Sequence, residues 1–320
     1  MSEEEDDIHF SQGFIVESSK AKYVVDKLLG EGGFGAVYRV YDTTNPSQKY
    51  AMKVEKKVEN RKDSKLKMEI AILKLVANDR GENSHFTQIV DRAKKDTYYF
   101  LVMQLVGKSL NDLKLKRPEK VLSLCTGLGA SMQCLEACQD LHKYGFIHRD
   151  LKPANYACGL GAKKRNIYIL DFGIARRFLN EKNELKGPRK KAKFKIAMFE
   201  PLFQSREQSN SHRWPAIVRM KWQPKTTSSH GSICFWILYN QQNREEVQRC
   251  KEECRNEKKE ILFEGIRCRT ELWKILEYVD SLKYYDHVDY GFIYEMLKAA
   301  ATSSGGSIDA PYDWETWPED

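Results

Sequence analysis

Alternating apolar and polar positions mark the first third of the chain. Residues 23–29 and 36–41 alternate in this way and are rich in β-branched and aromatic residues, so each segment predicts a β-strand. Residues 50–54 add a third, shorter apolar strand. The period changes in residues 66–75, where apolar side chains recur at intervals of three and four, as on one face of a helix. The first third is therefore predicted to be strands accompanied by one helix.

Apolar residues recur at helical spacing in the middle of the chain, and this pattern is lost in residues 196–240. A short apolar strand is predicted at residues 166–170. Residues 196–240 show poor helical periodicity, are rich in Trp, Ser, Gln and Pro, and contain no Asp. The face of a long helix is marked by Val121, Leu124, Leu128, Met132, Leu135 and Cys138.

Composition sets broad limits on the protein. Of its 320 residues 41% are hydrophobic and 31% charged, which suits one large two-lobed domain or two small ones. No run of 18 apolar residues occurs, so no transmembrane helix is expected, and the acidic residues 1–7 do not resemble a secretory signal. The eight cysteines follow no metal-binding spacing, which favours reduced thiols. We expect an intracellular protein, cytoplasmic or nuclear, that does not bind membranes.

Positive charge is concentrated in one stretch. The net charge of +8 is mild and does not by itself indicate a nucleic-acid partner. Residues 176–195, however, hold nine basic and two acidic side chains. The stretch is either a solvated surface loop or an anion-binding patch.

A glycine-rich turn separates the first two predicted strands. Gly30, Gly32 and Gly35 form a G-x-G-x-x-G pattern, which two different nucleotide-binding folds use. In a dinucleotide-binding fold the glycines open a helix, but here residues 36–41 continue as a strand. Strand, glycine loop and strand predict a lid whose backbone N–H groups approach phosphate oxygens. The alternatives are a simple turn and a dinucleotide-dependent oxidoreductase, which would rest on this pattern alone.

A lysine interrupts the third predicted strand. Lys53 stands among apolar residues, and a buried charge needs a partner. Glu69, on the helix that follows, is the candidate. A strand lysine paired with a helix glutamate is the arrangement that holds the α- and β-phosphates of ATP in protein kinases. The alternative is that Lys53 only extends its ammonium group to solvent.

The segment I-H-R-D-L-K-P-A-N, residues 147–155, is the most specific signal in the chain. In the kinase catalytic loop, H-R-D-x-x-x-x-N, the Asp accepts the proton of the substrate hydroxyl and the Asn binds Mg²⁺. Asp150 and Asn155 have that spacing. Lys152 is placed to reach the transferring phosphoryl group, and Arg149 suggests pairing with an anionic group of the following segment.

A second acidic motif, D-F-G, follows the apolar strand at residues 166–170. The strand delivers Asp171, and Gly173 allows the chain to turn. Asp171 is therefore predicted to hold Mg²⁺ across the β- and γ-phosphates. In order and together, the motifs predict transfer of a phosphoryl group from Mg²⁺-ATP to a protein hydroxyl.

The chain resembles the casein kinase I superfamily, and within it the tau-tubulin-kinase-like branch. The resemblance rests on G-E-G-G-F-G-A-V-Y, Y-A-M-K-V-E, H-R-D-L-K-P-A-N-Y and L-D-F-G-I-A-R, and residues 278–297 are similar to the family's C-terminal helices. It implies an α+β, two-lobed protein-kinase fold with a small β-rich lobe and a larger helical lobe. The expected divisions are an acidic tail at 1–20, the small lobe at 21–106, the large lobe at 107–300 and a C-terminal tail at 301–320.

The resemblance also implies site residues and substrates. Residues 101–113 are similar to the family's hinge, with Met103 as gatekeeper and Leu105 as the residue whose backbone would bond adenine. Lys152 implies Ser/Thr specificity, and the basic stretch suggests acidic or phosphorylated protein substrates. We expect a monomer that uses ATP and Mg²⁺ and does not bind nucleic acid. The expected site comprises Asp150, Lys152 and Asn155 for catalysis, Asn155 and Asp171 for the metal, and Leu29, Gly30, Glu31, Gly32, Gly33, Phe34, Gly35, Ala36, Val37, Lys53, Glu69, Met103 and Leu105 for ATP.

Residues 196–240 break the family pattern. The family has a buried D-D-L-E-S helix there, so we expect the larger lobe to be disturbed. Back-translation of residues 220–238, read two nucleotides on, permits E-M-A-T-K-D-D-L-E-S-W-I-Y-M-F-L-D, and residues 206–213 permit G-T-V-K-F-A-S. Our hypothesis is a frame-shifted or mis-spliced translation, and a divergent insertion is the alternative. The missing helix leaves open a nucleotide-binding pseudokinase or scaffold in place of an active kinase.

Overall fold

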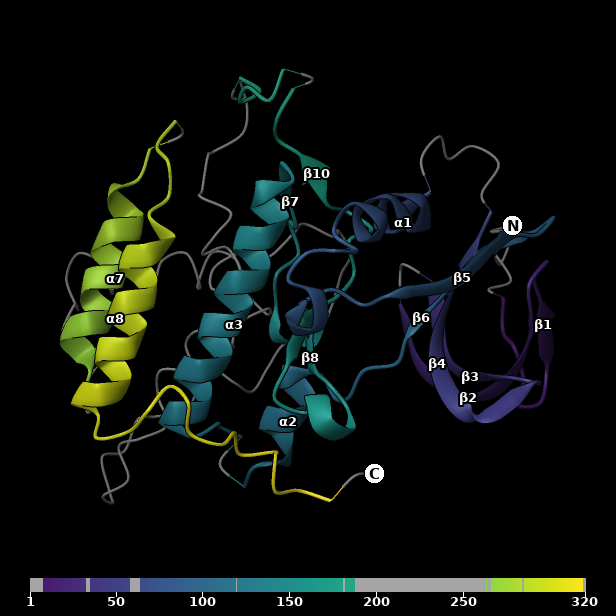
Figure 1. Cartoon of the computed structure of the whole chain (residues 1–320), viewed down its shortest axis with the longest axis horizontal. Helices are drawn as coiled ribbons and strands as arrows, with labels where there is room; N and C mark the ends of the chain where they lie inside the picture. The colour runs from purple at the N-terminus through teal and green to yellow at the C-terminus, as the bar shows by residue number, and fades with distance from the viewer. Residues whose placement is uncertain are drawn as a thin grey trace, which may run out of the picture.

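The computed structural model describes residues 8–32, 35–57, 64–118, 120–180, 182–187, 263, 266–283 and 285–318. A β-sheet forms one end of this part of the chain and helices form the other (Figure 1). The sheet has the strand order β1-β2-β3-β4-β6-β5, and all neighbouring strands are antiparallel. The strands are β1 (Ile15–Glu17), β2 (Lys22–Gly32), β3 (Gly35–Asp42), β4 (Asn45–Lys56), β5 (Ile89–Lys94) and β6 (Tyr98–Gln104).

Helix α1 (Lys65–Leu75) lies against β5 and β6. It buries Leu66, Ile72 and Leu73, which confirms the helical period seen in the sequence. These residues belong to a core that continues from the sheet into the helical end of the molecule. The opposite face of the sheet has its own apolar cluster, which includes Tyr38 and Met52.

The helical end is built around α3, which packs against α8, and α8 packs in turn against α7 (Figure 1). The predicted long helix begins at Leu124, because the hydroxyl of Ser123 accepts a hydrogen bond from Thr126 N (3.3 Å) and caps it. Val121 therefore precedes the helix. The helices are α2 (Leu110–Lys116), α3 (Leu124–Lys143), α7 (Arg269–Ser281) and α8 (Tyr290–Ser303), with short turns η1 (Gly81–Asn83), η2 (Pro153–Asn155) and η3 (Gly161–Lys163).

Two small antiparallel sheets lie between the large sheet and the helices. Strand β7 (Phe146–Ile147) pairs with β10 (Arg176–Arg177), and β8 (Tyr156–Cys158) pairs with β9 (Ile167–Ile169). These pairs connect the segments predicted to carry catalytic groups. A β-rich part and a helical part joined in this way confirm the α+β kinase architecture.

The C-terminal segment packs back onto the helical end. Tyr312 and Trp314 are buried, and the Trp314 indole N–H donates to Lys164 O at 3.0 Å. Asp313 accepts hydrogen bonds from Ser123 N (2.7 Å) and from the Thr126 hydroxyl (3.0 Å), so the tail also secures the first turn of α3.

The suspected segment at residues 196–240 lies outside the described residues, as do Gly33 and Phe34. Among the helices that the structure describes, none has both the length and the apolar composition needed to cross a membrane.

Candidate active site

Lys53 joins three elements where the sheet meets the helices. Its ammonium nitrogen lies 2.6 Å from Glu69 Oε2 on α1 and 3.0 Å from Asp171 Oδ1, in the loop after β9. The lysine and glutamate side chains are only 9% and 4% exposed. The structure thus brings the lysine of the strand into contact with both carboxylates that the sequence singled out.

Opposite charges offset the cost of burial at Lys53 and Asp171, whereas burial, together with the nearby Asp171, raises the pKa of Glu69. Burial alone would lower the pKa of Lys53, but attraction to Glu69 and Asp171 outweighs it and raises that pKa above its ordinary value. Burial would likewise raise the pKa of Asp171, and the neighbouring Lys53 ammonium instead holds that pKa below its usual range. A cation and an anion are therefore both present at neutral pH, as phosphate and metal binding require.

Strand alternation explains why Lys53 points at α1. Met52 and Val54 face the apolar cluster on the far side of the sheet, whereas Ala51 belongs to the core beneath α1. Lys53 lies on the same side as Ala51, because successive side chains of a strand point to opposite faces. The sheet therefore presents the lysine to the helix that carries Glu69.

The glycine-rich segment links β2 to β3 without a helix. Gly30 pairs with Val37 and Gly32 pairs with Gly35, so the predicted strand–loop–strand arrangement is confirmed. Gly35 has φ of +102°, and a Cβ there would lie 1.9 Å from Val54 O, which excludes any side chain. A Cβ on Gly30 or Gly32 would instead meet no atom within 4 Å, so space lies open beside the strands.

The catalytic loop gathers three of the predicted residues. Asp150 Oδ2 accepts hydrogen bonds from Lys152 Nζ (2.8 Å) and from Asn155 Nδ2 (3.1 Å), and Asn155 Nδ2 also donates to Asp150 O (2.7 Å). Both donors use the same carboxylate oxygen. The other oxygen, Oδ1, accepts no hydrogen bond within the described part of the chain and is left for an incoming hydroxyl.

His148 supports this loop, a role that sequence reasoning missed although the H-R-D motif contains the residue. Its Nδ1 accepts from Asp150 N (3.3 Å), so Nε2 carries the proton and donates to Leu170 O (2.9 Å). Burial lowers the pKa of His148 and keeps the ring neutral. One imidazole therefore connects the catalytic loop to the residue before Asp171.

The backbone turns sharply at Asp171. Its φ is +66°, a left-handed backbone conformation that residues other than glycine rarely adopt. The next residue, Phe172, is 1% exposed, and its ring centroid lies 5.3 Å from that of His148 and 5.9 Å from that of Phe86. Packing of Phe172 holds the strained turn, which directs the carboxylate of Asp171 to Lys53.

The segment after Asp171 is anchored to the catalytic loop. Arg176 pairs with Ile147 across β10 and β7. Arg149, which was predicted to pair with an anionic group, donates from Nε to Ile174 O at 2.6 Å. The two catalytic carboxylates thus lie on segments that are hydrogen-bonded to each other.

Comparison with known proteins gives this geometry its context. The family model of the protein kinase domain matches residues 23–221. The chain belongs to the protein kinase family. It is 31% identical over 328 residues to the serine/threonine-protein kinase spe-6 of Caenorhabditis elegans, spanning 98% of this chain and 82% of that protein. A casein kinase I-like protein of the same organism is 31% identical over 175 residues, 54% of this chain and 49% of its own length.

The chain is therefore a protein serine/threonine kinase. Its predicted catalytic residues come together in the structure, and its relatives carry the names of serine/threonine kinases. The pseudokinase alternative is not favoured, because the matching family model is that of the protein kinase domain and the relatives are named as serine/threonine kinases. A dinucleotide-dependent oxidoreductase is excluded by the strand that follows the glycines.

Apolar side chains of the kinase surround the position predicted for adenine. Met103 is buried on β6 opposite Ala51 of β4, and Leu105 follows directly after β6. Val37 and Leu105 pack against the same core as Met103, whereas Leu29 is 45% exposed at the edge. These surfaces would suit a flat base, and the contact of adenine with the Leu105 backbone stays a prediction.

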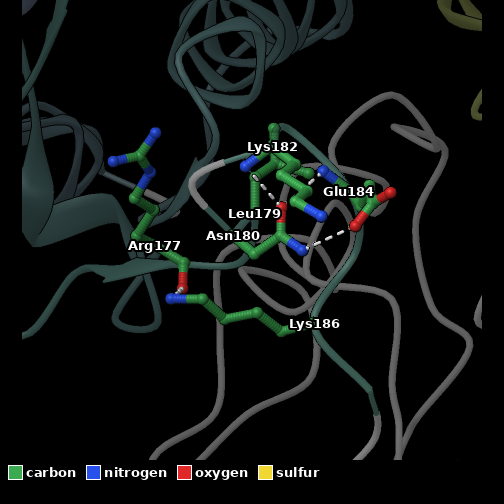
Figure 2. Close-up of a pocket in the computed structure, with 6 residues that line it drawn as sticks. All are labelled: Arg177, Leu179, Asn180, Lys182, Glu184 and Lys186. Atoms are coloured by element: carbon green, nitrogen blue, oxygen red, sulfur yellow. Dashed lines mark hydrogen bonds between the residues drawn. The ribbon is translucent and has the colours of Figure 1, made fainter.

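The first half of the basic stretch forms a hollow of about 560 Å³ after β10 (Figure 2). Asn180 shapes it: Oδ1 accepts from the backbone N–H groups of Lys182 and Glu184, both at 2.9 Å, and Nδ2 donates to Glu184 Oε2 at 2.8 Å. Three cationic side chains and one carboxylate line the hollow, which comprises Arg177, Leu179, Asn180, Lys182, Glu184 and Lys186.

The donor set of the kinase fits Mg²⁺ and a triphosphate. Asp171 Oδ2 and Asn155 Oδ1 accept no hydrogen bond from the described residues, so two hard oxygen ligands remain available. Within the described ranges no group of three or more His, Cys, Asp or Glu side chains could hold a metal. Mg²⁺ takes only one or two protein ligands and completes its shell with water and phosphate oxygens, so Asp171 and Asn155 would suffice to hold it.

Proposed function

We propose that this kinase transfers the γ-phosphoryl group of Mg²⁺-ATP to serine or threonine hydroxyls of acidic or phosphorylated proteins, as a member of the tau-tubulin-kinase-like branch of the casein kinase I superfamily. The observation that carries the proposal is the cluster of Lys53, Glu69 and Asp171 beside the ordered pair of Asp150 and Asn155. These contacts support the proposal because each group has the charge or hydrogen-bonding capacity that its proposed role requires.

Each of these residues has a separate role in the proposed reaction. Bound Mg²⁺-ATP supplies the phosphoryl group and neutralises charge on its phosphates. Lys53 holds phosphate oxygens, while Asp171 and Asn155 offer oxygens to the metal. Asp150 Oδ1 orients the substrate hydroxyl and accepts its proton, and Lys152 stabilises the charge that develops on the transferring group.

The basic hollow supports acidic substrates. It begins at β10, which pairs with the strand leading into the catalytic loop, so a peptide bound there would pass near Asp150. Lys182 and Lys186 line an open, charged surface, and charge-assisted hydrogen bonds to carboxylate or phosphate are roughly twice as strong as neutral ones.

A peptide assay tests the activity and its preference together. Peptides with one serine flanked by aspartates, by phosphoserine, by neutral residues or by lysines are incubated with Mg²⁺-ATP. We expect the acidic and phosphorylated peptides to have the highest kcat/KM, and Asp150→Asn to abolish transfer to all four. Equal kcat/KM for the acidic and basic peptides would overturn the substrate preference, and transfer by Asp150→Asn at the wild-type rate would overturn the mechanism.

Charge removal tests the place of binding. The double variant Lys182→Ala, Lys186→Ala should raise the KM for the acidic peptide several-fold and leave the KM for ATP unchanged, because rim charges steer and retain a charged partner. Lys94→Ala, an exposed lysine of β5 in the sheet, is the matched control. If the double variant and the control have the same KM for the acidic peptide, the peptide does not bind in the basic hollow.

We further propose that the kinase works as a monomer in the cytoplasm or nucleus. The described cysteines Cys125, Cys134, Cys138, Cys158 and Cys268 are free thiols, which supports a reducing compartment. Light scattering of the purified chain and fractionation of cells expressing it test the two statements.

A further inference from the structure

We propose that Glu55 is a positioning residue for phosphoryl transfer: from β4 its carboxylate holds the first turn of α1 and so keeps Glu69 on Lys53. The inference rests on the kinase activity of the chain and gives a role to Glu55, which closes the Y-A-M-K-V-E segment and to which the predicted catalytic residues assign none. Glu55 touches neither nucleotide nor substrate in this account, and its effect reaches the reaction through the helix.

The carboxylate of Glu55 accepts hydrogen bonds from three donors at the start of the helix. Oε2 accepts from Leu66 N at 2.6 Å and from the Ser64 hydroxyl at 2.7 Å, and Oε1 accepts from Lys65 N at 3.0 Å. The residue is 5% exposed. A buried carboxylate with three donors on one neighbouring element is held firmly, and it holds that element in return.

Helix α1 lacks a negative charge of its own at this end. Its first turn contains no acidic residue and carries Lys65 and Lys67, which oppose the positive end of the helix dipole. The hydroxyl of Ser64 accepts from Lys67 N (3.2 Å), which satisfies one further N–H group. Glu55 therefore supplies from the sheet the anion that helices usually carry within their own first turn.

The strand and the helix meet at two matched points. Lys53 and Glu55 are two positions apart on β4 and point to the same face, about 6.6 Å from each other along the strand. Their partners on α1, Leu66 and Glu69, are three positions apart, about 4.5 Å along the helix axis. One contact fixes the end of the helix and the other its second turn, so α1 can neither slide nor swing away without breaking a charged contact.

The first test is Glu55→Gln, which keeps the shape and removes the charge. Only one end of the amide can accept, so its NH₂ group must face either Lys65 N–H or the pair formed by Leu66 N–H and Ser64. We expect kcat to fall on the order of tenfold, the size expected for loss of one charge-assisted contact, with the KM for peptide unchanged. Unchanged kcat in a folded Glu55→Gln variant would overturn the proposal.

A double-mutant cycle separates positioning from general stability. If Glu55 acts through Glu69, then Glu55→Gln should bring little further loss of kcat in a Glu69→Gln background. Asp91→Asn is the matched control, since Asp91 is a buried carboxylate of the same sheet, 4% exposed, that accepts from the hydroxyls of Ser18 and Tyr23. Losses of kcat that simply add in the Glu55→Gln, Glu69→Gln double variant would overturn the proposal. So would a loss of kcat in Asp91→Asn as large as that in Glu55→Gln, if the two variants have the same melting temperature.

A measurement independent of catalysis distinguishes this inference from the proposed function. Hydrogen exchange should show faster exchange of the amides of Lys65 and Leu66 in Glu55→Gln, with the amides of β5 and β6 unchanged. Should that variant fail to fold, Glu55→Asp keeps the charge and shortens the side chain, and it should show the same change more weakly. Wild-type exchange at the start of α1 in both variants would overturn the role of Glu55, whatever the activity of the chain.

Discussion

Lys53 is buried, contacts two carboxylates and is predicted to bind phosphate. Lys53→Met keeps the length of the side chain and removes its charge. We expect kcat/KM to fall by about two to three orders of magnitude, the usual cost of removing a preorganised charge at the reacting phosphates. The melting temperature should also fall, because Glu69 is left buried without its cation. A coupled ATPase or peptide assay measures it.

Lys49→Met on the same strand is the control for this substitution. The Lys49 ammonium lies 3.9 Å from the centre of the Tyr41 ring, away from the carboxylates. Activity in Lys53→Met equal to that in Lys49→Met would contradict the assigned role.

His142 predicts a pH dependence of stability. Burial, and to a smaller extent the nearby His148, lowers the pKa of His142 to about 4, while the imidazole nitrogen Nδ1 lies 2.6 Å from the Tyr290 hydroxyl. Between pH 6.5 and 4 the unfolded chain binds a proton that the folded chain does not, so the free energy of unfolding decreases as pH falls through this window. The contribution is roughly 3 kcal/mol when complete.

Urea denaturation at pH 7.5 and pH 5 measures the effect. His142→Gln cannot titrate, so its stability should fall less between the two pH values than that of the wild type. Parallel losses in both proteins would show that His142 does not titrate as described.

Several residues that the sequence motifs single out lie in contact in the structure, Lys53 with Glu69 and Asp150 with Asn155, and their catalytic roles stay predictions. Lys53, Glu69, Asp150 and Asn155 were found because their chemistry requires fixed spacings along the chain. The hydrogen bond from Arg149 to Ile174 O was not foreseen, since a backbone carbonyl carries no sequence signal. The role proposed for Glu55 was missed for a related reason: two of the partners named for it are backbone N–H groups, which nearly every residue possesses.

At the scale of elements, the C-terminal segment acts on a helix far away in the sequence. Trp314 is 3% exposed and packs in the central core, next to the residue that secures the start of α3. Trp314→Ala should lower the free energy of unfolding by about 3–5 kcal/mol, the usual cost of emptying a large aromatic site. Tyr285→Ala, at a residue 63% exposed, should change it by less than about 0.5 kcal/mol.

Thermal and urea unfolding measure both variants. A loss for Trp314→Ala no larger than that for Tyr285→Ala would show that the tail contributes little to the fold.

Elements with a strong period were predicted to within a few residues, and others were not. The helix at residues 66–75 and the strand at 166–170 appear as α1 and β9, because α1 buries one patterned face and the continuous apolar run of β9 is buried on both sides. The start of α3 was placed too early, since Val121 continues the apolar spacing although Ser123 caps the helix after it. Capping by a distant Asp313 depends on tertiary packing and leaves no local pattern.

For the whole molecule, ligand binding should raise stability by mass action. Mg²⁺-ATP at about 100 times its Kd should stabilise the kinase by about 2.7 kcal/mol, seen as an upward shift in melting temperature. ATP with EDTA should shift it less, because Asp171 and Asn155 then have no cation to share with the phosphates. Asp171→Asn should remove most of this Mg²⁺-dependent difference, whereas Asp280→Asn on α7 should preserve it. Equal shifts with and without Mg²⁺ in the wild type would exclude a metal at this site.

The segment at residues 196–240 makes a prediction about the transcript. If the frame-shift hypothesis holds, the full-length message across codons 190–245 reads D-D-L-E-S in the shifted frame, and the large lobe regains a buried helix. Sequencing the message measures this directly. Codons that cannot encode D-D-L-E-S in that frame would leave the divergent insertion as the explanation.

The two contacts that β4 makes with α1 also bear on which insertions and deletions this kinase could accept during evolution. Deleting one residue between Tyr50 and Lys53 would shift the strand by one position and turn the side chains of Lys53 and Glu55 to the opposite face together. Such an event would remove the lysine predicted to bind phosphate and the proposed anchor of α1 in a single step. The middle of β4 should therefore keep a constant length among functional descendants of this gene, even where its apolar residues are exchanged.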